Sequence, residues 1–297
     1  MSRTESELAG GDEKPRSLHD PALYLVGTPI GNLEDITLRA LRLLKEVDVI
    51  ACEDTRQTQK LLNHYAIATR TTSYHEHNEM TKSAELVKEM QEGTSVALVT
   101  DAGMPGISDP GYRLVTLAIR HHIPVVPVPG ASAFLAALVA SGLATESFRF
   151  SGFLPAKRGE RRAVLEAVKS SPRTQVFYEA PHRILETMED IIELLAEARP
   201  VVIAREVTKL HEEFLRGRAA DVLKTLRERE AIKGEITLLI GKAEPESQGP
   251  APRVSVKQRV EQIMAEEELD EKAALKRVAK ERGISKSEAY RELQREK

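Results

Sequence analysis

The sequence has a single cysteine, Cys52, and no tryptophan among its 297 residues. One cysteine excludes an intramolecular disulfide framework and a metal cage built from cysteines. Aromatic residues make up 4% of the chain, so the core, which a hydrophobic content of 41% makes sizeable, is expected to be aliphatic. The length predicts two domains of ordinary size, with room for a small appendage.

Long apolar runs are also missing. No stretch approaches the length of about 18 apolar residues that a membrane-spanning helix requires. The first 20 residues are polar and lack the apolar centre of a signal peptide. We therefore expect a disordered leader at 1–20, no membrane association and a cytoplasmic protein. The net charge of −3 argues against a general nucleic-acid coat protein but leaves room for a local basic patch.

Two kinds of ligand-binding motif are absent as well. The chain has no GxxxxGK[ST] motif and no GxGxxG that opens a helix after a strand, so a nucleoside triphosphate or a dinucleotide is not the favoured ligand. Its eight histidines are scattered, and HEH at 75–77 lacks the spacing of a helix-borne pair of ligands. We predict no metal site.

The chain does show a regular alternation of short strand-like runs and longer helical ones. Strands are expected at 22–27, 48–53, 95–100 and 124–129, with a short strand near 71–74, helices between them and a buried helix at 130–143. This order predicts a mostly parallel sheet covered on both faces.

The pattern restarts after residue 143 and divides the rest of the chain. A second α/β unit is expected at 144–242, where EFLRG and GEITLLIG can add antiparallel strands. Residues 243–253 have the composition of a linker, and 254–297 contain only helical patterns. Ser285 and Glu288 have the spacing of a capping box, and Gly283 suits the end of the preceding helix. The predicted fold class is α/β: an N-terminal domain at 21–143, a C-terminal domain at 144–242 and a helical appendage.

Three irregular loops rich in glycine or proline follow predicted strands: GTPIGNLED (27–35), DAGMPGISDPG (101–111) and VPGASA (128–133). The carboxyl ends of parallel strands meet at one edge of a sheet, where ligands collect, so we expect these loops to lie together. Glycine lets a ligand approach the main chain, and proline stiffens a loop before binding. One such loop alone is an ordinary turn. Three on one edge favour a site that holds a nucleoside through backbone groups.

Several sequence blocks together resemble the tetrapyrrole-methylase superfamily, and more narrowly its ribosomal RNA small-subunit methyltransferase branch. The blocks cover about residues 21–241 and read LYLVGTPIGNLEDIT, ACEDTRQTQKLL, ALVTDAGMPGISDPG, VPVPGASA, FSGFLP, VFYEAPHR and REVTKLHEE. Tetrapyrrole-modifying members usually carry a GxGDP-like loop, whereas this chain has DAGMPGISDPG, which fits the RNA branch. The resemblance implies two α/β domains with S-adenosylmethionine in the cleft between them, usually within a homodimer. It also implies methylation of the ribose 2′-oxygen of a cytidine in the decoding region of 16S rRNA, within the small ribosomal subunit.

The resemblance also implies which residues bind the methyl donor. Carried over position by position, they are Thr28, Pro29, Asp101, Ala102, Gly103, Pro105, Ser108, Ser132 and Ala133 from the first domain, and Tyr178, Glu179, Ala180 and Ala204 from the second.

Methyl transfer to a ribose hydroxyl needs orientation, which can supply roughly 7–11 kcal/mol, and gains from a proton acceptor. The carboxylates and histidine expected in the cleft are Glu53, Asp54, Asp101, Asp109, His75 and Glu179. Asp54 and Asp101 lead as catalytic candidates because each follows a predicted strand immediately, and one of them is expected to accept the proton or orient the ribose. A cap at a helix start explains Glu53, Asp54 and Asp109 equally well.

Basic residues near the cleft are candidates for binding the RNA backbone. They are Arg56, Lys157, Arg158, Arg161, Arg162 and Arg183, and a solvated helix start is the alternative for the cluster at 156–162. The helical tail resembles a helix-turn-helix unit that either contacts RNA or packs against another copy. Two other functions stay open: a methylase of this superfamily that acts on a tetrapyrrole or a protein, and an RNA-binding protein that retains the fold without catalysis.

Overall fold

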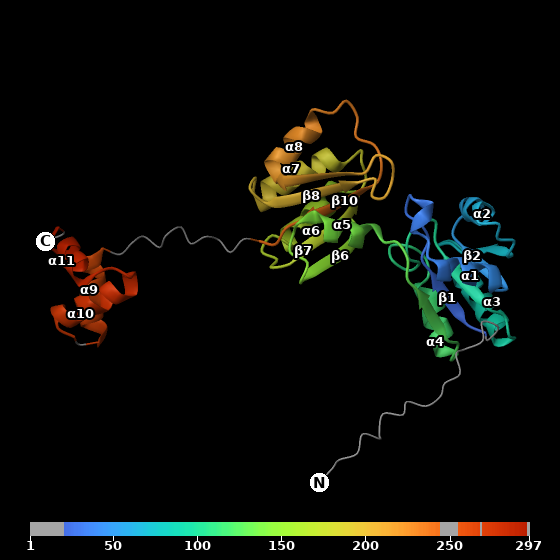
Figure 1. Cartoon of the computed structure of the whole chain (residues 1–297), viewed down its shortest axis with the longest axis horizontal. Coiled ribbons are helices and arrows are strands. Elements are labelled where there is room, and N and C mark those ends of the chain that lie inside the picture. The colour runs from blue at the N-terminus through green and yellow to red at the C-terminus, as the bar shows by residue number, and fades with distance from the viewer. Residues whose placement is uncertain (1–20, 244–254, 268, 296–297) are drawn as a thin grey trace, which may run out of the picture. The chain divides into compact units, whose positions relative to one another are not determined.

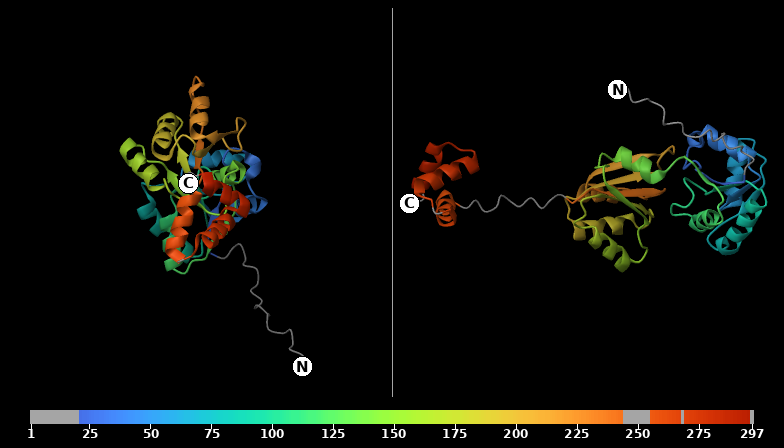
Figure 2. Two further views of the ribbon diagram at one scale, coloured as in Figure 1. Left: turned by 90° about the vertical axis from the view of Figure 1, so that its left-hand side faces the viewer. Right: turned by 90° about the horizontal axis from the view of Figure 1, so that it is seen from below.

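The computed structural model describes residues 21–243, 255–267 and 269–295. The predicted leader at 1–20 and all but the first residue of the predicted linker lie outside the described residues. The chain divides after Ala243 into two compact units, the first of which contains two sheets (Figures 1 and 2).

The first sheet is parallel, with the strand order β3-β2-β4-β1-β5. Its strands are β1 (Leu23–Val26), β2 (Val49–Cys52), β3 (Thr71–Ser73), β4 (Val96–Val99) and β5 (Val125–Val128). The strands β2 and β4 read VIAC and VALV and are buried throughout, as a parallel strand covered on both faces requires.

Helices cover both faces of this sheet, as the sequence predicts. On one face lie α1 (Leu38–Glu46), which follows the short η1 (Leu33–Asp35), and α2 (Thr55–His64). On the other face lie α3 (Glu79–Gln91) and α4 (Tyr112–Arg120). The core is aliphatic, for example where Leu86 and Leu114 pack with Leu98.

The second sheet has the order β6-β7-β10-β8-β9 and is chiefly antiparallel. Its strands are β6 (Phe148–Phe153), β7 (Thr174–Glu179), β8 (Pro200–Arg205), β9 (Glu213–Arg218) and β10 (Ile236–Ile240). The β6–β7 pair is parallel, whereas β10 pairs antiparallel with β7 and β8, and β9 pairs antiparallel with β8. The last strand therefore occupies the centre of this sheet.

Helix α5 (Ala133–Ser141) belongs to the second sheet by its packing. Its residues Ala137 and Leu138 are buried against Val202 and Leu239, on the face opposite α6 (Arg158–Ala167), α7 (Ile184–Leu195) and α8 (Ala219–Arg227). The expected N-terminal domain at 21–143 included this helix. The packing instead places the junction between the two sheets before Ala133, because an almost wholly apolar helix can be covered by either neighbour.

The second unit contains α9 (Val256–Glu267), α10 (Glu271–Arg282) and α11 (Lys286–Arg295) around a small aliphatic core. The predicted capping box is confirmed: the Glu288 N–H donates to the Ser285 Oγ at 3.2 Å, and the Ser285 N–H donates to Glu288 Oε2 at 3.0 Å. Gly283 ends α10 with φ of 64°, as predicted. Among the described residues of both units, no helix combines the length and the apolarity needed to cross a bilayer.

Candidate functional site

The loops that follow β1 and β4 are bonded to each other. The Thr28 N–H donates to the Gly103 carbonyl at 2.9 Å, and the Gly103 N–H returns a bond to the Thr28 carbonyl at 3.1 Å. The Thr28 hydroxyl donates to the Thr100 carbonyl at 3.0 Å. Because β1 and β4 are neighbours in the sheet, these bonds hold the two loops as one rigid edge.

The loop after β5 packs directly on the loop after β1. A Cβ on Gly27 would lie 2.7 Å from the Gly130 Cα, and a Cβ on Gly130 would lie 2.8 Å from the Gly27 Cα. Only glycine permits two main chains to approach this closely. The three loops predicted from the sequence therefore do lie together at the carboxyl edge of the first sheet.

A cavity of about 460 Å³ opens at this edge and is lined from both sheets. Its size lies within the range of roughly 300–1,000 Å³ typical of small-molecule sites. The lining from the second sheet includes Tyr178 and the strand start Glu235–Thr237. We call this cavity the strand-end cavity.

The structure brings nine of the expected donor-binding residues to the strand-end cavity. They are Asp101, Ala102, Gly103, Ser108, Ser132, Ala133, Tyr178, Glu179 and Ala180. Thr28 is 3% exposed and lies behind the lining, where it clamps two loops. Ala204 is fully buried in β8. Pro29 and Pro105 stand in the loops without lining the cavity.

An aromatic shelf forms one side of the strand-end cavity. The rings of Phe153 and Tyr178 lie 5.3 Å apart between centroids, and Phe150 lies 5.0 Å from Tyr178. Burial raises the pKa of the Tyr178 phenol, so this group stays protonated. Because Phe153 is 62% exposed, the shelf offers an open apolar surface on which a flat ring can lie.

Sequence reasoning missed several lining residues, among them Ile30, Ile107, Phe153 and the strand start Glu235–Thr237. Phe153 stands in FSGFLP, one of the blocks that carry the family resemblance, so the sequence did mark this segment as a candidate for the site. Glu235–Thr237 were not marked in this way, because nothing in the local sequence shows that the last strand is inserted at the centre of the second sheet.

Three carboxylates converge at one end of the strand-end cavity: Glu53, Asp101 and Asp109. The Thr100 hydroxyl donates to Glu53 Oε2 at 3.1 Å. Burial raises the pKa of Asp109 to about 6; the polar side chain of Thr100 opposes this, and the charges of Glu53 and Asp101 add to it. Asp109 is therefore the carboxylate of this group that can both accept and release a proton near neutral pH.

Asp54 is engaged by its neighbours in α2. Its carboxylate accepts from the Arg56 N–H at 2.8 Å and pairs with Arg56 Nη2 at 2.8 Å. These hydrogen bonds from Arg56 lower the pKa of Asp54 to about 2. The Asp54 N–H donates to Asp101 Oδ1 at 3.2 Å, so Asp54 caps α2 and holds the Asp101 carboxylate at the cavity.

Glu179 is also committed to structure. Its carboxylate accepts from Arg183 Nη2 at 2.7 Å, from the Thr187 hydroxyl at 2.7 Å and from the Ala180 N–H at 2.7 Å. It is 2% exposed. Glu179 therefore fixes the turn between β7 and α7 that carries Ala180 to the cavity.

The basic cluster at the start of α6 turns inward. Arg158, Arg161 and Arg162 all bond to Asp190 of α7, whose side chain is fully buried. Burial alone would raise the pKa of Asp190, but the three guanidinium groups outweigh it and hold that pKa below its ordinary value. The expectation that Arg161 contacts RNA is corrected here, because its side chain has no exposed surface.

The other expected RNA-binding residues also form ion pairs, at the surface or close to it. Arg56 pairs with Asp54, Lys157 with Glu160 and Arg183 with Glu179. The side chains of Arg56 and Lys157 are 87% and 82% exposed, so a phosphate can approach them at the surface. Across the described part of the chain, no group of three His, Cys, Asp or Glu side chains is placed to hold a metal ion.

Comparison with known proteins adds to this geometry. The family described as Tetrapyrrole (Corrin/Porphyrin) Methylases matches residues 22–223. The chain is 51% identical over 272 residues to the Ribosomal RNA small subunit methyltransferase I of Halalkalibacterium halodurans, covering 90% of this chain and 93% of that protein. It is 44% identical over 271 residues to the protein of the same name from Escherichia coli O157:H7, covering 91% and 93%.

Solved structures share the fold. The uroporphyrin-III-C-methyltransferase of Thermus thermophilus aligns with a TM-score of 0.53 and 23% identity, over 75% of this chain and 95% of that one. A diphthine synthase aligns with a TM-score of 0.58 and 18% identity, over 74% and 90%.

Proposed function

The chain belongs to the tetrapyrrole (corrin/porphyrin) methylase family, and from this membership we propose that it methylates the ribose 2′-oxygen of a cytidine in the decoding region of 16S rRNA. The methyl donor of the family is S-adenosylmethionine. The observation that carries the proposal is the match, over nine-tenths of the chain, to proteins named for methylation of small-subunit ribosomal RNA. That match favours RNA over a tetrapyrrole or a protein as the acceptor, and catalysis over binding alone.

The residues of the strand-end cavity fit the proposed donor. The Phe153–Tyr178 shelf suits an adenine ring, and the hydroxyls of Ser132 and Thr237 suit ribose and amino acid groups. When bound, the donor supplies a methyl group activated by the positive charge on its sulfur. The carboxylates of Asp101 and Asp109 favour that cationic state, because opposite charges attract strongly in a partly buried site.

We assign separate roles to the two aspartates singled out from the sequence. Asp101 lines the cavity, and we propose that its carboxylate orients the ribose. Asp54 acts as a positioning residue, because its N–H holds Asp101 while its own carboxylate is taken up by Arg56. Rigid loops on both sides supply the orientation on which this chemistry depends.

RNA binding, assembly and location follow from the same proposal. Exposed Arg56, Lys157 and Arg158 are proposed to contact phosphates of the small subunit. We also propose a homodimer in the cytoplasm. Helix α5 supports the dimer because it exposes Leu135 (46%) and Val139 (71%).

The direct test incubates the protein with methyl-labelled donor and either 30S subunits that lack the modification or naked 16S rRNA. The proposal expects label in 30S subunits, located by nuclease mapping on one cytidine ribose. Label on a base, or label in no RNA despite measurable donor binding by calorimetry, would refute it.

A further inference from the structure

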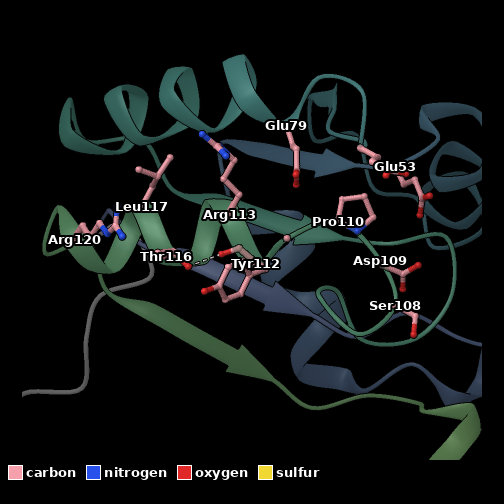
Figure 3. Close-up of a pocket in the computed structure, with 12 residues that line it drawn as sticks. Glu53, Glu79, Ser108, Asp109, Pro110, Tyr112, Arg113, Thr116, Leu117 and Arg120 are labelled. Atoms are coloured by element: carbon pink, nitrogen blue, oxygen red, sulfur yellow. Dashed lines mark hydrogen bonds between the residues drawn. The ribbon is translucent and has the colours of Figure 1, made fainter. Parts of the chain in front are cut away.

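A second cavity lies beside the strand-end cavity and is lined entirely from the first sheet and its helices. It measures about 670 Å³ and lies between the start of α3 and the length of α4, from Tyr112 to Arg120. Glu53, Ser108 and Asp109 line both cavities, so these three residues form a shared wall. In Figure 3, Glu53, Pro110, Asp109 and Ser108 gather at one end of this cavity, and Arg113 extends from α4 toward α3.

The function proposed above does not use this cavity. Both acidic and basic side chains line it. Carboxylates come from Glu53, Glu76, Glu79 and Asp109, and guanidinium groups from Arg113 and Arg120. Arg113 stands among them, and its Nε is buried without a hydrogen-bond partner in the part of the chain that the structure describes. Tyr112 lies at the rim and is 79% exposed. The carboxylates outnumber the guanidinium groups and so repel a phosphate, whereas a neutral ring with both donors and acceptors can bond to carboxylates and to a guanidinium group.

We propose that this second cavity receives the base of the nucleotide to be methylated and selects cytosine. The inference rests on the proposed function, which supplies the donor in the adjoining cavity. A nucleotide whose base enters here places its ribose at the shared wall of Glu53, Ser108 and Asp109, next to the donor. Enzymes that modify one nucleotide of a folded RNA commonly splay it into a pocket in this way.

Cytosine matches the lining better than uracil does. The exocyclic amine of cytosine is a donor that carboxylates such as Glu79 accept, and its ring nitrogen and carbonyl accept from a guanidinium such as Arg113. Uracil presents a carbonyl where cytosine has the amine, so its oxygen would face carboxylates. Tyr112 at the rim offers a ring for stacking.

Asp109 has a further role at the shared wall. As the ribose oxygen forms its bond to the methyl carbon and the carbon–sulfur bond breaks, Asp109 accepts the proton of the hydroxyl on its carboxylate. The products are a methyl ether, a neutral thioether and a protonated Asp109, which returns its proton to water. Asp109 is partly buried and lies near the carboxylate of Glu53. Burial and that neighbouring charge both raise the pKa of Asp109, which suits it to accept the proton.

Photo-crosslinking tests the placement without depending on turnover. The full-length protein is bound to 30S subunits that carry 5-iodocytidine at the target position, and S-adenosylhomocysteine occupies the donor site. Irradiation is expected to attach the base to the peptide of residues 109–120, and Tyr112→Ala is expected to abolish the attachment. Because Tyr112 is largely exposed, this variant is expected to fold. Attachment to a peptide of the second sheet would overturn the inference.

Selectivity is tested on 30S subunits with cytidine or uridine at the target. Arg113→Gln and Glu79→Gln are expected to lower the ratio of single-turnover rates, cytidine over uridine, by about 10- to 100-fold with donor affinity unchanged. Arg39→Gln, an exposed position on α1 at the opposite face of the sheet, is the matched control. Unchanged ratios in both variants would refute the base pocket and leave the proposed function standing. If the wild-type protein labels no RNA, both the base pocket and the proposed function are refuted.

Discussion

The main chains at Gly27 and Gly130 approach each other closely behind the strand-end cavity, and this contact offers a sharp test. In Gly27→Ala, the added Cβ would meet the Gly130 Cα and the Met104 Sδ at 2.7 Å each. Carbon atoms pack at about 3.5 Å or more, so the loops after β1 and β5 must separate by about 0.8 Å. Overpacking of this kind costs about 1–3 kcal/mol of unfolding free energy.

The displacement also reaches the proposed donor site. Ser132 and Ala133 follow Gly130 and line the cavity, and a misplacement of about 1 Å can cost up to about 100-fold in rate. We therefore expect Gly27→Ala to lower the melting temperature by about 2–4 °C for each kcal/mol lost and to weaken donor binding at least about tenfold. Scanning calorimetry and titration calorimetry with S-adenosylmethionine measure the two effects.

Gly159→Ala is the matched control. Gly159 stands in α6, where an added Cβ has no neighbour within 4 Å. The same chemical change should raise stability there by up to about 1 kcal/mol, because alanine favours helix, and leave donor binding unaltered. Wild-type stability and wild-type donor affinity in Gly27→Ala would show that the loops do not abut as described.

Three further outcomes are expected. Asp190→Asn should lower the unfolding free energy, measured by urea titration, by about 3–5 kcal/mol, because it leaves the buried guanidinium of Arg161 without its buried counter-charge. The control is Glu146→Gln, which removes one partner of the exposed ion pair with Lys242 and should change the unfolding free energy by no measurable amount. The pKa of Asp109 is raised from 3.8 to about 6 by burial, with Thr100 opposing and Glu53 and Asp101 adding to the shift, so folding takes up a proton between these values. The contribution of Asp109 to stability should thus fall as pH rises through that interval. In Asp109→Asn the melting temperature should depend less on pH, and the rise in methylation rate near pH 6 should be lost. An unchanged pH dependence of both quantities would contradict the role assigned to Asp109. Truncation after Ala243 should leave donor affinity intact, because the strand-end cavity and both sheets lie in the first compact unit; a loss of binding would contradict that division.

The sequence predicted the first sheet well because each of its strands carries a local signal. Runs such as VIAC and VALV are apolar throughout and end in loops rich in glycine, proline or aspartate, so their parallel pairing and shared edge followed from pattern alone. The capping box at Ser285 was equally local and was confirmed.

Non-local features escaped prediction. Helix α5 is apolar on nearly all sides, so its sequence could not show which sheet it covers. The cluster at 156–162 looked like a basic surface because its counter-charge, Asp190, lies a whole strand and helix later in the chain. The sequence also could not distinguish Asp109 from the other candidate carboxylates. Its raised pKa depends on burial and on Glu53, Thr100 and Asp101, which only the fold brings close to it.

The position of β10 has a consequence for how the protein is made. Every strand of the first sheet precedes residue 129, so that half can fold while the rest of the chain is still being synthesised. The second sheet stays split until the strand at 236–240 arrives and bridges β7 and β8. Since Glu235–Thr237 also line the strand-end cavity, a nascent chain cannot complete the proposed donor site until this late strand has been synthesised.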